Sequence, residues 1–109
     1  MNYIAEIKAF YGRLAAVPLS ADAQALWHLM MHLANCADWP PALCLAEAVL
    51  TGTLGISHGA FVAARRELVK AGLILHVPQP GRQAPHYFLR SIMKPGKLQV
   101  IVDNTGKTK

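Results

Sequence analysis

The sequence predicts a small, mostly helical α+β domain, and three observations lead to this fold class. Apolar residues recur every three or four positions in several segments, which is the period of a helix with one buried face. Further along, two strand-like runs at 73–77 and 86–90 are separated by turn-forming residues, which is typical of a β-hairpin. A length of 109 residues leaves room for one domain with an ordinary core.

Two helices are expected in the first part of the chain. Residues 3–17 carry two neighbouring apolar stripes, so this helix is apolar over a broad arc, and Pro18 ends it. Ser20 is placed to cap a second helix of about 16 residues. The run Trp39-Pro40-Pro41 stops that helix, and residues 42–45 are a candidate short strand.

The middle of the chain predicts a pair of helices joined by a glycine turn. A short helix is expected from Ala46 to Leu54, and Gly55-Ile56-Ser57 then caps another that runs to about Ala71. Gly72 follows its end, where a left-handed backbone costs glycine nothing. A short helix, a turn, a second helix and a hairpin form the layout of a winged helix-turn-helix, whose second helix enters the major groove of DNA.

We therefore expect a winged helix-turn-helix domain over residues 1–91, with an N-terminal helical extension and the C-terminal β-hairpin as the wing. Residues 92–109 are expected to form a basic, flexible tail, in which Leu98–Val102 is a candidate strand. The net charge of +5 is unevenly distributed: residues 1–54 carry two Lys or Arg against four Asp or Glu, whereas residues 55–109 carry nine against two. The halves therefore have charges of −2 and +7, as expected where one face binds a polyanion, although a solvated surface with a basic tail explains them equally well.

Several other classes of protein are excluded by the same sequence. No apolar run approaches the ~18 residues of a membrane-spanning helix, and residues 1–6 do not resemble the start of a secretory signal. Two cysteines make no disulfide framework, so a cytoplasmic location is expected. None of the six carboxylates is spaced for acid–base catalysis, and a helix precedes Gly55–Gly59 where a nucleophile elbow needs a strand. We expect neither enzymatic activity nor a cofactor.

A metal site is the sharpest alternative chemistry that the sequence offers. His28, His32 and Cys36 follow one another at one-turn spacing, with Cys44 downstream, and imidazole and thiolate groups both bind zinc. The spacing matches neither a Cys-x-x-Cys pair nor a His-Glu-x-x-His helix. We therefore expect no metal, and interpret these side chains as ordinary surface histidines and a partly buried cysteine.

Two stretches resemble known families. The segment from Leu54-Gly55-Ile56-Ser57 to Ala71-Gly72-Leu73-Ile74 is similar to winged-helix domains generally. Residues 1–11, Pro18-Leu19-Ser20, 25–30 and Asp38-Trp39-Pro40 resemble the N-terminal domain of phage-type replisome organisers, the DnaD-like replication proteins of Gram-positive bacteria and their phages. The resemblance covers about residues 1–91. It implies a role in bacterial or phage DNA-replication initiation at the primosome, with a domain that binds DNA and self-associates.

Members of that family usually continue into a second, helical domain that contributes contacts to DNA and to helicase loaders. These 109 residues do not extend that far, so we expect either an excised domain or a short relative. Other replication-initiation or helicase-loading proteins are possible partners on the strength of the resemblance. A winged-helix transcriptional regulator is the alternative within DNA binding, and a protein-interaction or oligomerisation module that does not bind DNA is the alternative outside it.

The candidate DNA contacts lie on the helix after Ser57 and at the hairpin loop. Backbone amides at the start of a helix favour phosphate, and Arg66 and Lys70 form a basic stripe one turn apart. The full candidate set is Ser57, His58, Gly59, Val62, Arg66, Lys70, Arg82 and Gln83. Because Gly59 and Val62 offer base edges no side-chain hydrogen bond, we expect phosphate-dominated, weakly specific binding to double-stranded DNA. In the alternative interpretations, the same helix face is a protein interface or a solvated surface.

The broad apolar arc of the first helix raises the question of what covers it. A surface helix needs one apolar stripe, and an exposed second stripe commonly marks an interface. Together with the family resemblance, this predicts a homo-oligomer. The candidate interface residues are Tyr3, Ile7, Phe10 and Leu14. The alternative is that both stripes are buried within one chain.

Overall fold

The computed structural model describes residues 1–93 as four helices and a three-stranded antiparallel sheet. In chain order the elements are α1 (Tyr3–Ala16), α2 (Ala21–Cys36), β1 (Leu43–Cys44), α3 (Glu47–Leu54), α4 (His58–Lys70), β2 (Ile74–Val77) and β3 (His86–Leu89). The predicted α+β class with mainly helical content is confirmed. The candidate strand Leu98–Val102 and most of the expected tail lie outside the described residues.

The helix ends follow the capping signals in the sequence. The Ser20 hydroxyl accepts a hydrogen bond from Ala23 N at 3.1 Å, and the Ser57 hydroxyl does the same for Ala60 N. Each satisfies one amide that the first turn of a helix leaves without a partner. Gly55 and Gly72 follow the ends of α3 and α4 with φ of 69° and 76°, a backbone conformation that residues with a Cβ rarely adopt.

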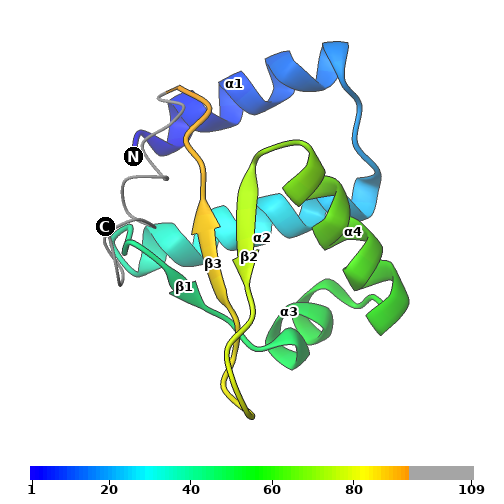
Figure 1. The fold of residues 1–109 in the computed structure, drawn as a ribbon. Coiled ribbons are helices and arrows are strands. Elements are labelled where there is room, and N and C mark those ends of the chain that lie inside the picture. Colours follow the sequence, from blue (N-terminus) through cyan, green and yellow to red (C-terminus); the bar gives the residue numbers. More distant parts are fainter. Residues whose placement is uncertain (94–109) are drawn as a thin grey trace.

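The sheet has the strand order β1-β3-β2, with β3 in the middle. Leu43 pairs with Tyr87 on one side of β3, and His76 pairs with Tyr87 on the other. Strands β2 and β3 are joined by a loop that projects beyond the sheet (Figure 1). Helix α2 crosses behind the sheet, and it contributes more buried residues than any other described element: Ala23, Leu26, Trp27, Met30, Met31 and Ala34.

Helix α1 is held to the rest of the domain at points along its length. The Phe10 ring is 1% exposed and stacks on Trp27 with the ring centroids 3.9 Å apart and the planes 3° apart. The Arg13 guanidinium donates to the carbonyl of Ala71. Near its start, α1 carries Glu6, which is the one buried charged residue of the described chain.

Glu6 anchors the segment that follows β3. Its carboxylate accepts hydrogen bonds from Ser91 Oγ at 2.5 Å and from Ile92 N at 2.7 Å. Met93 N lies 3.4 Å from the same group. The domain boundary expected at residue 91 therefore falls within a segment whose backbone is bonded to α1.

The burial of α1 corrects the expectation of an oligomer interface at Phe10. Its ring is enclosed by the domain's own core, so it is not available to a second subunit. Tyr3, Ile7 and Leu14 are half-buried against the same core. The broad apolar arc is present as predicted, but the stripe that was expected to form the oligomer interface faces the core. The exposed apolar residues of α1 lie on the other flank, at Ile4 and Tyr11, which are 63% and 52% exposed.

In the part of the chain that the structure describes, no helix is both long enough and apolar enough to cross a membrane.

Candidate nucleic-acid interface

Helix α4 turns one face to the core and the opposite face to solvent. The core face carries Phe61, Ala64 and Leu68, all essentially buried. The outward face carries Gly59, Ala63, Arg66 and Lys70, all exposed. The helical period in the sequence predicts both faces. Val62 departs from the prediction, because it is half-buried and packs against the core cluster.

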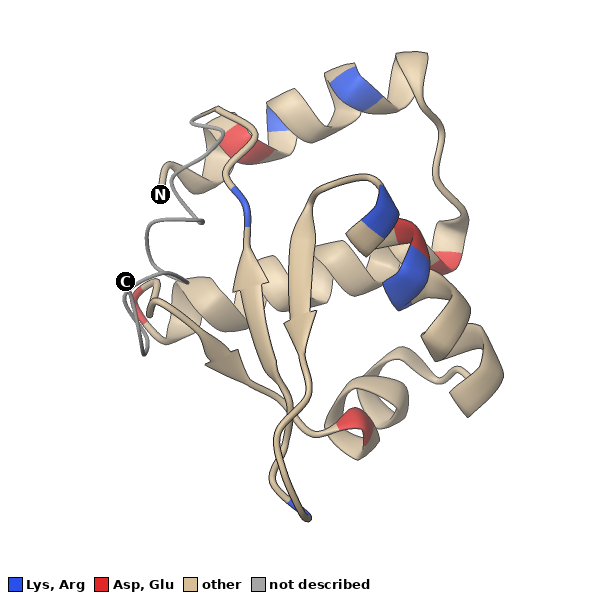
Figure 2. Ribbon diagram, viewed as in Figure 1, with Lys and Arg blue, Asp and Glu red and all other residues tan. Residues whose placement is uncertain are grey.

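The outward face of α4 is positively charged over its C-terminal half. Arg66 and Lys70 lie one turn apart, and Figure 2 shows Lys and Arg positions in blue on this part of the helix. Glu67 lies between them, but its carboxylate accepts hydrogen bonds from Ser20 N at 3.0 Å and Ser20 Oγ at 2.6 Å. These hydrogen bonds from Ser20 lower the pKa of Glu67 and direct its charge toward the start of α2.

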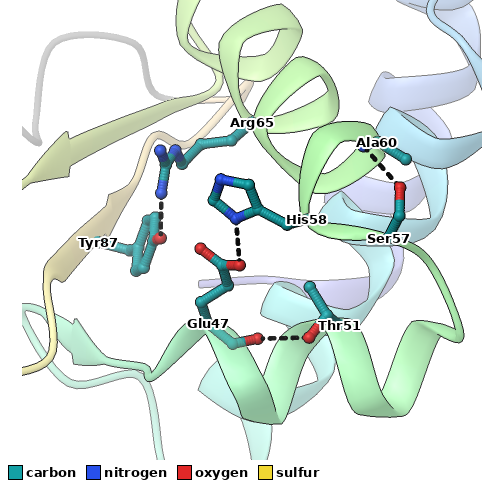
Figure 3. Close-up of polar contacts among 7 residues, drawn as sticks. All are labelled: Glu47, Thr51, Ser57, His58, Ala60, Arg65 and Tyr87. Carbon is teal, nitrogen blue, oxygen red and sulfur yellow. Dashed lines mark hydrogen bonds and ion pairs between the residues drawn. The ribbon is translucent and has the colours of Figure 1, made fainter.

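The N-terminal end of α4 is occupied by groups from within the domain. Ser57 uses its hydroxyl oxygen to accept from Ala60 N. His58 donates from Nδ1 to Glu47 Oε2 over 2.5 Å, since an ionised carboxylate can only accept (Figure 3). A carboxylate therefore lies where the sequence led us to expect a phosphate. No sequence pattern indicates this pair, because its members are eleven positions apart on two helices.

A shallow depression of about 220 Å³ lies beside the outward face, between α4 and β2. It is lined by Val62, Arg65, Arg66, Val69 and His76. Arg65 is held there, because its guanidinium donates to the Tyr87 hydroxyl at 3.3 Å (Figure 3) and lies 5.1 Å from the centre of the Phe61 ring. Sequence reasoning passed over Arg65, which lies one turn after the buried Phe61.

The surroundings of His76 disfavour its positively charged form. Its ring stacks on Tyr87 with centroids 5.2 Å apart. Burial lowers the pKa of His76, and the positive charge of Arg65 lowers it further. The cations available on this side of the domain are therefore the arginines and Lys70.

The loop between β2 and β3 carries the other predicted contact residues. Arg82 and Gln83 are exposed, and Gly81 beside them has a φ of 66°. Figure 2 places the blue tip of this loop well away from the blue positions of α4. The structure does not gather the predicted residues into one patch. It gives two separate positive regions, one on α4 and one at the loop tip.

Helix α3 contributes no cation to either region. It contains no Lys or Arg, and its exposed residues other than Glu47 are uncharged: Ala48, Val49, Gly52 and Thr53. A helix that crosses phosphates by side-chain contacts usually presents cations to them. Any phosphate contact through α3 must therefore come from its backbone or from its small polar groups.

The structure does not bring the potential metal ligands of the sequence together into one site. His28 is half-buried, contrary to the expectation of a surface position, and its Nε2 lies 3.1 Å from the Tyr11 hydroxyl. Burial lowers the pKa of His28. His32 faces Cys36, with Nε2 and Sγ 3.7 Å apart. Cys44 lies in β1, and its thiol donates to the carbonyl of Ala84. Within residues 1–93, no three His, Cys, Asp or Glu side chains form a cluster that would hold a metal ion.

Comparison of the chain with protein-family models, with curated proteins and with solved structures finds no match.

Proposed function

We propose that this chain is a DNA-binding domain of the winged helix-turn-helix type that binds double-stranded DNA mainly through contacts to the phosphates. The observation that carries the proposal is the exposed pair Arg66 and Lys70, one turn apart on the outward face of α4. The order of elements supports it, because α3, the turn at Gly55 and α4 precede a hairpin with a projecting loop. In this interpretation α4 meets the groove and the β2–β3 loop is the wing.

The chemistry of α4 argues for weak sequence preference. Base edges are read by side chains that donate or accept hydrogen bonds. The outward positions in the N-terminal half of α4 are Gly59 and Ala63, which do neither. The affinity would then come from phosphate neutralisation, which falls with rising salt by a slope of about −0.9 per contact in log–log form. Arg66, Lys70 and Arg82 together predict a slope of about −2.7 from the described part of the chain.

A titration of duplex DNA at several salt concentrations tests this proposal. Arg66→Ala, Lys70→Ala and Arg82→Ala should each reduce the magnitude of the salt slope by about 0.9. Lys8→Ala is a matched control, because it removes the same charge from an exposed position on α1. Failure to form a complex even at low salt would contradict DNA binding by this domain. Equal effects of all four variants would contradict an interface on α4 and the loop.

The proposed biological role is DNA-replication initiation in bacteria or phages, within the primosome. It rests on the resemblance of residues 1–91 to the N-terminal domain of replisome organisers. A transcriptional regulator would use the same helix, but it would need to discriminate its operator from other sequences. Competition between duplexes of unrelated sequence separates the two roles, because equal competition by all of them favours the replication role.

A protein-interaction module is the second candidate function, and one observation favours it. Apart from the Glu47–His58 pair, the exposed residues of α3 and of the first half of α4 carry no charge, unlike a typical surface that meets phosphates. Such a surface can pack closely on another protein. This candidate gains support if the duplex titration gives no complex at low salt.

We further propose self-association through the outer flank of α1 rather than through Phe10. Ile4 and Tyr11 are exposed there, two turns apart. Exposed apolar side chains on one helix flank commonly mark an interface. Sedimentation of the wild type and of Ile4→Glu tests the proposal, since the charge should reduce any dimer. A monomer at high concentration in the wild type would rule it out.

A further inference from the structure

Glu47 combines two properties that matter for the proposed DNA contact. It is the first residue of α3, and its carboxylate bonds the first residue of α4, with Oε2 2.5 Å from His58 Nδ1 (Figure 3). Its side chain is 38% exposed, and that of His58 is 72% exposed. The pair therefore lies at the surface, at the end of α4 that has the positive end of the helix dipole.

The charge of Glu47 changes what this end of α4 can bind. An N-terminal helix end would otherwise attract phosphate through its free amides and its dipole. Here one of those amides bonds the Ser57 hydroxyl, and the nearest exposed donor, His58, bonds Glu47. A phosphate brought to this end would meet a like charge at close range. None of the exposed residues of α3 is a cation that would offset it.

We propose that Glu47 is a positioning residue for DNA: it excludes phosphate from the N-terminal end of α4 and confines the contact to the half that carries Arg66 and Lys70. This inference rests on the proposed DNA-binding function. The inference agrees with the composition of the outward face. Gly59 and Ala63 have no side-chain hydrogen-bonding groups for base edges, so this half of α4 has no need to lie close to the bases. It also predicts that the His58 imidazole contacts phosphate once the charge of Glu47 is removed.

The test compares duplex binding by Glu47→Gln with that by Asp38→Asn. Asp38 is exposed in the segment after α2, and its φ of 62° is one that asparagine tolerates, so the control changes the net charge equally at a distant place. Glu47→Gln should bind duplex DNA about fivefold more tightly at low salt than Asp38→Asn, as expected for removal of one like charge at contact distance. Its salt slope should also be steeper by about 0.9, because a new phosphate contact forms.

A second pair of variants identifies the group that makes the new contact. His58→Ala combined with Glu47→Gln should lose the gain in affinity and the steeper salt slope of Glu47→Gln, because the imidazole makes the new phosphate contact. Thermal unfolding of each variant checks that the fold is retained. Equal affinities and slopes for Glu47→Gln and Asp38→Asn would overturn the inference while leaving DNA binding intact. Absence of wild-type binding at low salt would instead overturn the proposed function on which it rests.

Discussion

Replacement of Phe10 by alanine should destabilise the domain by about 3–5 kcal/mol, the usual cost of removing a buried aromatic ring. The ring is 1% exposed and stacks face to face on Trp27, which is equally buried, so its removal would leave a cavity inside the core. Phe10 is also the deepest point of contact of α1 with the core. Since about 1 kcal/mol shifts the Tm of a domain of this size by about 4–8 °C, the Tm should fall by at least ~12 °C.

Urea unfolding followed by circular dichroism measures this cost, and Ile4→Ala is the matched control on the same helix. Ile4 is 63% exposed, so its truncation should change the unfolding free energy by no more than about 0.5 kcal/mol. Phe10→Leu, which keeps most of the apolar volume, should cost less than Phe10→Ala and stay folded. If Phe10→Ala and Ile4→Ala unfold at the same urea concentration, the assignment of the inner face of α1 is wrong.

Three further predictions concern polar groups and backbone that tie the elements together. Glu6→Gln should cost about 1.5–3 kcal/mol in urea unfolding, because the buried carboxylate accepts charge-assisted hydrogen bonds from Ser91 Oγ and Ile92 N. The hydrogen bonds from Ser20 lower the pKa of Glu67, so they stabilise the domain at pH values above the ordinary carboxyl pKa of 4.5. This stability is lost as the pH falls through the pKa of the folded state. Between about pH 6 and pH 3, the Tm of Glu67→Gln should therefore fall less than the Tm of the wild type. Gly72→Ala should cost about 1 kcal/mol in thermal unfolding, because its φ of 76° strains any residue with a Cβ, whereas Gly12→Ala within α1 should not destabilise.

The boundaries of the helices were predictable because they depend on neighbouring residues. Ser20 and Ser57 cap helices in the structure as the sequence indicates, and Gly72 has the positive φ that its position predicts. The hairpin strands also follow from local pattern and turn residues. These features depend only on nearby residues, which is why the local sequence predicts them.

The partners across the fold were not predictable in the same way. Periodicity identifies two apolar stripes on α1, but which stripe faces the core depends on where Trp27 lies in space. Glu6 stands alone among apolar residues, and its bonding partners are 85 and 86 positions away. Likewise, the outward cations of α4 follow from the helical period, whereas the Glu47–His58 pair depends on how α3 meets α4. The spacing of residues along one element does not predict contacts between elements.

The bonds of Glu6 to the segment after β3 have a consequence for how the domain opens. A helix at the edge of a domain often frays on its own, with a smaller opening free energy than the core. Here α1 and the segment that follows β3 share one buried carboxylate, so α1 cannot leave without also releasing that segment. The beginning and the end of the described chain therefore belong to one cooperative unit.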